Sequence, residues 1–120
     1  MKLRIVIFLL TALCGLGTLA IAQQTQVPIM VKADGGFDTC AVGEIIKASA
    51  VRAGPGIGYR KIDTLKVGNH VWMFDDKGDW VGVAYGSDEI ECSPVKKDKA
   101  YDGPGKSGWV QKKYVRLMAG

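Results

Sequence analysis

The sequence predicts an all-β domain, and three observations support this fold class. From residue 44 onward, no run of ten or more residues carries a clear helical stripe of apolar side chains. Hydrophobic runs of strand length alternate with turns that contain glycine, proline and aspartate. Two of these runs, "HVWMF" at 70–74 and "WVGVAY" at 80–85, are apolar on both faces. Such strands are typical of a tightly curled barrel or of a surface that a partner covers.

The N-terminal segment reads as a signal peptide over residues 1–22. Lys2 and Arg4 precede an uncharged, apolar run over 5–22, which closes with the small-x-small pattern "AIA". A retained membrane anchor is the alternative for a run of this length. Two glycines inside the run and its small-residue end favour cleavage, so we expect a periplasmic or secreted protein with no stable membrane insertion afterwards.

Cleavage after Ala22 leaves 98 residues, enough for one small domain. It also removes two positive charges, so the formal net charge falls from +4 to +2. The remaining lysines and arginines are interleaved with acids, apart from short runs at 96–99 and 112–116 that resemble solvated faces. The charge pattern therefore predicts no nucleic-acid partner.

The cysteines also fit export. Cys14 lies in the signal segment, and Cys40 and Cys92 remain as an even pair in an oxidising compartment. We expect them to form one disulfide that closes a loop of 53 residues counting both cysteines. The chain-entropy model gives such a bridge about 4 kcal/mol of stabilisation. A metal site is disfavoured because the chain has no CxxC motif and one histidine.

The segments follow in order along the mature chain. Residues 23–38 show little periodicity and are expected to form a flexible lead-in, followed by the folded domain over 39–118. "GEIIKASAVRA" at 43–53 is expected to be the first strand, ending at a glycine-rich loop. The next two hydrophobic runs lie on either side of residues 75–79, whose acids and glycine suit a hairpin turn.

A long excursion is expected over residues 86–107, where acids, lysines and "DGPGK" interrupt the strand rhythm. "SGWVQKKYVRLM" at 107–118 then predicts a short strand, one turn and a last strand.

Four motifs resemble the bacterial SH3-like (SH3b) domain. They are "VRAGPGIGYRKI" at 51–62, "LKVG" at 65–68, "GDWVGV" at 78–83 and "GWVQKKYV" at 108–115. The chain is most similar to exported, single-domain members with an extra cysteine pair and a long loop before the final "SGWV". The resemblance implies a small SH3-like β-barrel of about five strands, with 86–107 as an inserted loop.

The glycine-rich loop has an architectural explanation. Gly54, Gly56 and Gly58 permit backbone angles that other residues avoid, so positive φ angles are expected there, and Pro55 restricts its own φ. The loop would reverse the chain and place Tyr59 on the barrel. A phosphate-binding loop is disfavoured because no Lys-Ser or Lys-Thr pair follows and no helix begins there.

Catalytic residues are scarce, so we expect no enzyme and no cofactor. His70 reads as a half-buried strand residue, and pairing would silence Cys40 as a nucleophile. The carboxylates at 75–76 and at 88–91 fall in predicted loops, where solvation explains them.

Recognition is better supported, because aromatic side chains stand at motif positions near the loops. Arg52 and Tyr59 could meet a carboxylate or a sugar. The resemblance implies that Trp80 and Tyr114 line a peptide groove, with Gln111 where peptide-binding relatives often carry proline. Trp109 and Tyr85 are expected in the core. The candidate ligand-binding residues are Arg52, Tyr59, Trp80, Gln111 and Tyr114.

These residues suggest an exported, non-catalytic module that binds a peptidoglycan stem peptide or an envelope protein. The alternative is a structural or inhibitory accessory protein that acts through the 86–107 loop on an envelope enzyme or assembly. The sequence does not indicate an oligomeric state.

Overall fold

The computed structural model describes residues 25–31, 41–91 and 99–119, and it confirms the all-β class. The described segments form nine strands and one short 3-10 helix, η1. The elements in chain order are β1 (Met30–Val31), β2 (Ala41–Ile45), β3 (Ser49–Arg52), β4 (Lys61–Leu65), β5 (His70–Lys77), β6 (Trp80–Tyr85), β7 (Lys99–Ala100), β8 (Lys106–Gln111), η1 (Lys112–Tyr114) and β9 (Val115–Ala119).

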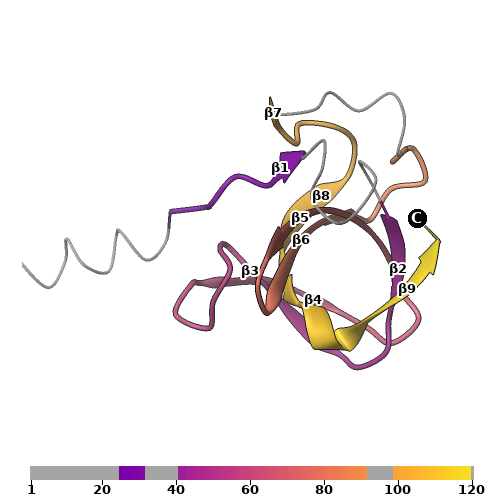
Figure 1. The fold of residues 1–120 in the computed structure, drawn as a ribbon, viewed down its shortest axis with the longest axis horizontal. Helices are drawn as coiled ribbons and strands as arrows, with labels where there is room; N and C mark the ends of the chain where they lie inside the picture. The colour runs from indigo at the N-terminus through magenta and orange to yellow at the C-terminus, as the bar shows by residue number, and fades with distance from the viewer. Residues whose placement is uncertain (1–24, 32–40, 92–98, 120) are drawn as a thin grey trace, which may run out of the picture.

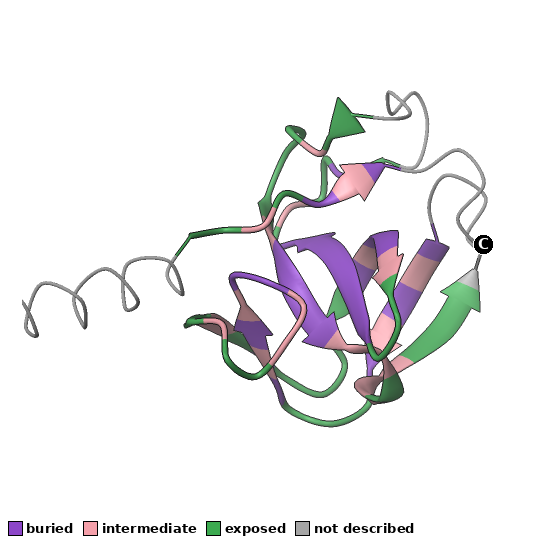
Figure 2. Ribbon diagram, turned by 60° about the vertical axis from the view of Figure 1, so that its left-hand side comes forward, coloured by how far each residue is buried: buried purple, intermediate pink, exposed green. Residues whose placement is uncertain are grey.

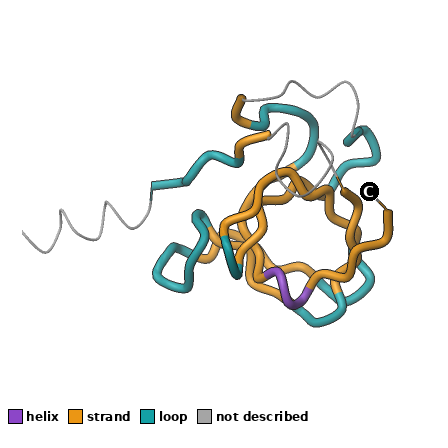
Figure 3. The backbone as a smooth tube through the Cα atoms, in the orientation of Figure 1, coloured by secondary structure: helices purple, strands orange, loops and turns teal. Residues whose placement is uncertain are grey.

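Seven of the strands form one antiparallel sheet in the order β4-β3-β8-β6-β5-β2-β9. The sheet curls strongly, so its strands surround a common interior (Figures 1 and 3). It remains open, because β4 and β9 are its two ends in the hydrogen-bonded order. In the described residues, no helix has the length and apolar character that a membrane span requires.

The expected single strand over 43–53 is divided into β2 and β3, which corrects the sequence prediction. Residues 46–48 separate them and are exposed. β2 pairs with β5 and β9, whereas β3 pairs with β4 and β8. The chain therefore has to turn between two distant positions in the sheet order. The Ser49 hydroxyl supports this turn by donating to the Lys47 carbonyl at 2.7 Å.

The β5–β6 hairpin is tighter than predicted. Lys77 pairs with Trp80, so the turn consists of Gly78 and Asp79 alone, and Gly78 has a φ of 68°. A positive φ at this position is expected in a two-residue hairpin turn and favours glycine. Asp75, which the sequence suggested was a solvated turn residue, instead lies inside β5 and is 0% exposed.

The interior of the curled sheet holds the first hydrophobic core. In β6, Val81, Val83 and Tyr85 point to this side, where they meet residues from β2, β3, β5 and β8. Figure 2 shows the buried positions concentrated on the central strands, whereas β9 is largely exposed. The predicted burial of Tyr85 is confirmed, with 5% of its surface exposed.

A second core covers the outer face of the same strands. Trp80 and Ala84 of β6 point outward, where they pack with Phe74, Trp109 and Ile90. Trp109 is fully buried, as predicted. The two apolar faces of β5 and β6 are therefore both covered by this chain's own residues, one by the sheet interior and the other by segments outside the sheet.

Residues 25–31, which we call the strap, provide much of this cover. The sequence predicts a flexible lead-in over 23–38, but this part of it is packed on the sheet, and the rest of that range lies outside the described residues. Ile29 and Val31 are 4% and 1% exposed. The buried carboxylate of Asp75 accepts the Met30 N–H at 3.0 Å. The Trp109 indole N–H donates to the Val27 carbonyl at 3.0 Å. Hydrogen bonds and apolar burial together hold the strap on the sheet.

The 86–107 segment also contributes cover. β7 pairs with β1 in a two-stranded sheet, and Tyr101 stacks on Phe74 with ring centroids 4.7 Å apart. Ile90 is buried in the outer core. The described parts of the predicted insertion are thus packed against the sheet. The predicted Cys40–Cys92 disulfide and the signal segment 1–22 lie outside the described residues.

Candidate functional site

The glycine-rich loop, residues 53–60, is held by its own backbone. The Ala53 N–H donates to the Arg60 carbonyl at 2.8 Å, and the Gly56 N–H donates to the Gly54 carbonyl at 2.9 Å. None of Gly54, Gly56 and Gly58 has a positive φ, so that expectation is wrong. At Gly54 the requirement is space, because an added Cβ would lie 2.4 Å from the Tyr59 ring.

Arg52 and Tyr59 are brought together by this loop, but in a structural contact. The Arg52 guanidinium donates to the Tyr59 backbone carbonyl at 3.0 Å and so ties the two ends of the loop. The Tyr59 ring packs over Gly54 and is half-buried. Both side chains stabilise the conformation of the loop. Their role is therefore to position the loop tip, and they do not themselves line the cavity.

Trp80 and Gln111 form the centre of the candidate site. Trp80 follows the β5–β6 turn directly and Gln111 ends β8, and the two residues are cross-strand partners. The Lys112 N–H donates to the Asp79 carbonyl at 2.8 Å and fixes η1 against the hairpin turn. Trp80 is 9% exposed and contributes mainly to the outer core. Gln111 is partly buried.

These two residues line a cavity of about 600 Å³ between the glycine-rich loop, the hairpin turn and η1. Ile57 at the loop tip forms one wall and is 75% exposed. Asp79 and Lys113 bring opposite charges to the cavity, together with Lys112. The Lys112 ammonium is engaged with Asp76 at 2.5 Å, whereas Lys113 has no ion pair within the described residues.

Gln111 also carries an orphaned polar atom. Its Oε1 is buried and has no hydrogen-bond partner within the described residues. A buried acceptor without a partner costs about 1–3 kcal/mol. A donor that reached this oxygen would therefore recover stability.

Tyr114 does not line the cavity, which separates it from Trp80 and Gln111. It lies at the end of η1, and the ammonium groups of Lys47 and Lys113 are each 5.1 Å from its ring centroid. Cation–π contacts of this kind hold Lys113 beside the ring. Tyr114 thus orients one charged wall of the cavity.

The cavity residues that sequence reasoning missed are Ile57, Lys112 and Lys113. In the sequence, the two lysines resemble part of a solvated basic run. The sequence around Ile57 does indicate an exposed apolar side chain, because an isoleucine between two glycines of a predicted loop has few neighbours to bury it. An exposed apolar side chain on a loop held by its own hydrogen bonds is available to contact a ligand.

His70 is exposed at the start of β5, which corrects the expectation of a half-buried residue. No group of three or more histidine, cysteine, aspartate or glutamate side chains in the described ranges is placed to hold a metal ion.

Asp63 and Tyr85 have shifted pKa values, and the contact between them is structural. The Tyr85 hydroxyl donates to the Asp63 carboxylate at 2.9 Å. The Thr64 N–H, this hydroxyl and nearby Lys106 hold the pKa of Asp63 below its ordinary value, against a smaller opposing effect of burial. Burial, followed by the bond to Asp63, raises the pKa of Tyr85 far above its ordinary range. The pair joins β4 to the end of β6, away from the cavity.

Comparison of the chain with protein-family models, with curated proteins and with solved structures found no match.

Proposed function

We propose that this protein is a non-catalytic, exported SH3-like module that binds an envelope ligand, either a peptidoglycan stem peptide or a periplasmic protein. The observation that carries the proposal is the cavity floored by the Trp80–Gln111 cross-strand pair. The four sequence motifs support the SH3-like assignment, together with a curled antiparallel sheet and a 3-10 helix before its last strand.

The cavity suits a peptide-like ligand because it combines an apolar wall with polar groups of both signs. Ile57 and Trp80 offer contact area to an aliphatic side chain. Lys113 can meet a carboxylate, and Asp79 can meet an amine. Rotation of the Gln111 amide about its broad terminal torsion would turn Oε1 toward a ligand N–H.

The loop's rigidity adds to this proposal. Hydrogen bonds within residues 53–60 and the Arg52 contact fix the wall that carries Ile57. A wall ordered before binding loses little conformational entropy when the ligand arrives. The accessory-protein alternative has less support, because the described parts of 86–107 cover the sheet through Ile90 and Tyr101.

Binding to purified sacculi and to a synthetic stem peptide tests the proposal. Ile57→Ala and Lys113→Ala should each weaken retention of the mature protein on sacculi by about fivefold or more. Lys66→Ala removes an exposed lysine from the turn after β4 and should change nothing. Circular dichroism verifies that all three variants are folded.

The outcomes separate the candidate ligands. Loss of retention in the two cavity variants alone assigns wall peptide to the cavity. If sacculi are not bound and a purified periplasmic protein is captured with the same dependence on Ile57 and Lys113, the ligand is a protein. Binding that is unchanged in the Ile57 and Lys113 variants but depends on Lys99 or Tyr101 would overturn the cavity proposal. It would indicate that the 86–107 segment binds the ligand.

A further inference from the structure

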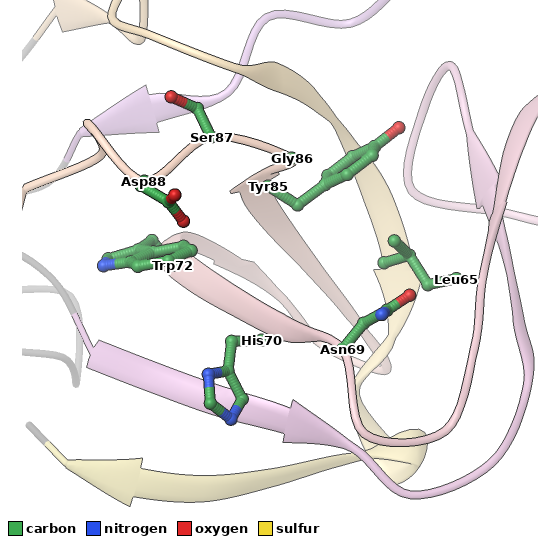
Figure 4. Close-up of a pocket in the computed structure, with 8 residues that line it drawn as sticks. All are labelled: Leu65, Asn69, His70, Trp72, Tyr85, Gly86, Ser87 and Asp88. Carbon is green, nitrogen blue, oxygen red and sulfur yellow. The ribbon is translucent and has the colours of Figure 1, made fainter.

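A second cavity, of about 380 Å³, lies at the other end of the β5–β6 hairpin (Figure 4). His70 and Trp72 come from the start of β5, and Tyr85 and Asp88 from the end of β6 and the turn that follows. Trp80 lines the first cavity and Tyr85 the second, and the five steps of β6 between them, at about 3.3 Å each, separate the two by about 17 Å along the strand. The two cavities are therefore independent.

Most polar groups around this second cavity are already used within the protein. The Tyr85 hydroxyl donates to Asp63 at 2.9 Å. The Asn69 side-chain oxygen accepts the Lys66 N–H at 2.8 Å, and the Ser87 hydroxyl accepts the Glu89 N–H at 3.1 Å. In Figure 4 the hydroxyl groups of Tyr85 and Ser87 point away from Trp72. These groups shape the cavity and leave little capacity for a ligand.

Asp88 is different, because its carboxylate makes no hydrogen bond or ion pair within the described residues. It is exposed, and Figure 4 shows it pointing toward the half-buried indole of Trp72. No lysine or arginine is among the described residues that line the cavity. Within the described residues, the polar groups left for a ligand are thus the Asp88 carboxylate, beside the Trp72 ring, and the exposed His70 imidazole.

We propose that this cavity binds an organic ammonium group, meaning a protonated amine carried on a short aliphatic chain. The ammonium would lie between the Asp88 carboxylate and the face of Trp72, where a charge-assisted hydrogen bond and a cation–π contact act together. The aliphatic chain would lie against Leu65 and the Tyr85 ring, which are each 5% exposed and form the apolar floor. An anion would face the negative Asp88 carboxylate there, so the site discriminates by charge.

Titration with pentylammonium chloride, followed by amide and indole N–H resonances, tests this site. Pentylammonium should shift the Trp72 indole N–H and the Gly86 amide with a Kd in the millimolar range, as expected of so small a ligand. The resonance of Trp72 is identified by its loss in Trp72→Phe. Pentan-1-ol should bind about fivefold or more weakly, and pentanoate should produce no shift at about 50 mM.

Two variants separate a local site from a general effect of charge. Asp88→Asn should raise the Kd about five- to tenfold, whereas Glu89→Gln removes an equal charge one residue away and should leave it within about twofold. The buried Trp109 indole resonance reports that each variant is folded. Trp72→Leu, followed at Gly86, gives a second test and should weaken binding as well. Equal effects of Asp88→Asn and Glu89→Gln, equal binding of pentan-1-ol, or no shift at Trp72 would overturn the proposal.

Discussion

At the residue scale, single polar side chains connect parts of this small fold that are distant in sequence. Asp75 is fully buried and accepts the Met30 N–H, and Asp63 accepts the Tyr85 hydroxyl. Each of these two bonds joins residues that are distant in the sequence, so each forms only when the chain is folded.

We expect Asp63 to make the stability of the fold sensitive to acid. Its pKa is lowered from the ordinary 3.8 in the folded state, so the carboxylate stabilises the fold above about pH 4, and this stabilisation is lost as the pH falls further. Asp63→Asn should be less stable than the wild type at pH 7, and the difference should shrink as the pH falls below about 4. Thermal unfolding across this range measures it. A constant difference at every pH would refute the assignment, and Asp79→Asn serves as the exposed control.

At the scale of elements, the strap is what allows β5 and β6 to be apolar on both faces. It crosses β6 at Gly82, where an added Cβ would lie 2.9 Å from the Ile29 side chain and 3.2 Å from the Asp75 Cβ. The glycine is needed for close approach and not for an unusual backbone angle. The strap and the strand are thus fitted to one another.

This fit predicts an energetic coupling between Gly82 and Ile29. Gly82→Ala should destabilise the protein by about 1–3 kcal/mol through overpacking. Ile29→Ala should cost about 2–5 kcal/mol through a lost apolar side chain. The double variant should cost less than the sum, because the space left by Ile29 accepts the new methyl group. Urea unfolding of the four proteins provides the cycle, and strict additivity would show that the strap does not pack there in solution.

At the scale of the whole molecule, the fold is a curled sheet with an inner core and an outer core, the second closed by the strap and by parts of 86–107. The first cavity has a wall with two lysines and the second has the Asp88 carboxylate, at opposite ends of one hairpin. Cleavage after Ala22 would leave the strap intact. The expected mature protein would therefore still contain the residues that close the outer core.

We expect the protein to be exported and its two remaining cysteines to be oxidised to a disulfide. Protein recovered from the periplasm or medium should begin near Gln23 and contain a Cys40–Cys92 bridge, which stabilises the chain by about 4 kcal/mol on the entropic model. Intact mass with and without reduction before alkylation measures both features. Two thiols that react without reduction would contradict the bridge, and an unprocessed N-terminus would contradict cleavage.

Local sequence patterns are sufficient to predict the all-β class and several features of the fold. The strand period, the hairpin at Gly78, and the burial of Trp109 and Tyr85 all follow from patterns a few residues long. Trp80 and Gln111, which the motif positions single out, both line the first cavity. Such features depend on neighbours in the chain, whose geometry the residue types already constrain.

Tertiary structure alone decided the remaining features. The strap, the burial of Asp75 and the division between β2 and β3 rest on contacts between residues far apart in the sequence. Met30 and Asp75, for example, are 45 positions apart. A polar or aperiodic segment looks the same in sequence whether it is solvated or paired with a distant partner. The sequence determined which strands are apolar on both faces, and only the folded chain determined that its own N-terminal segment covers the outer one.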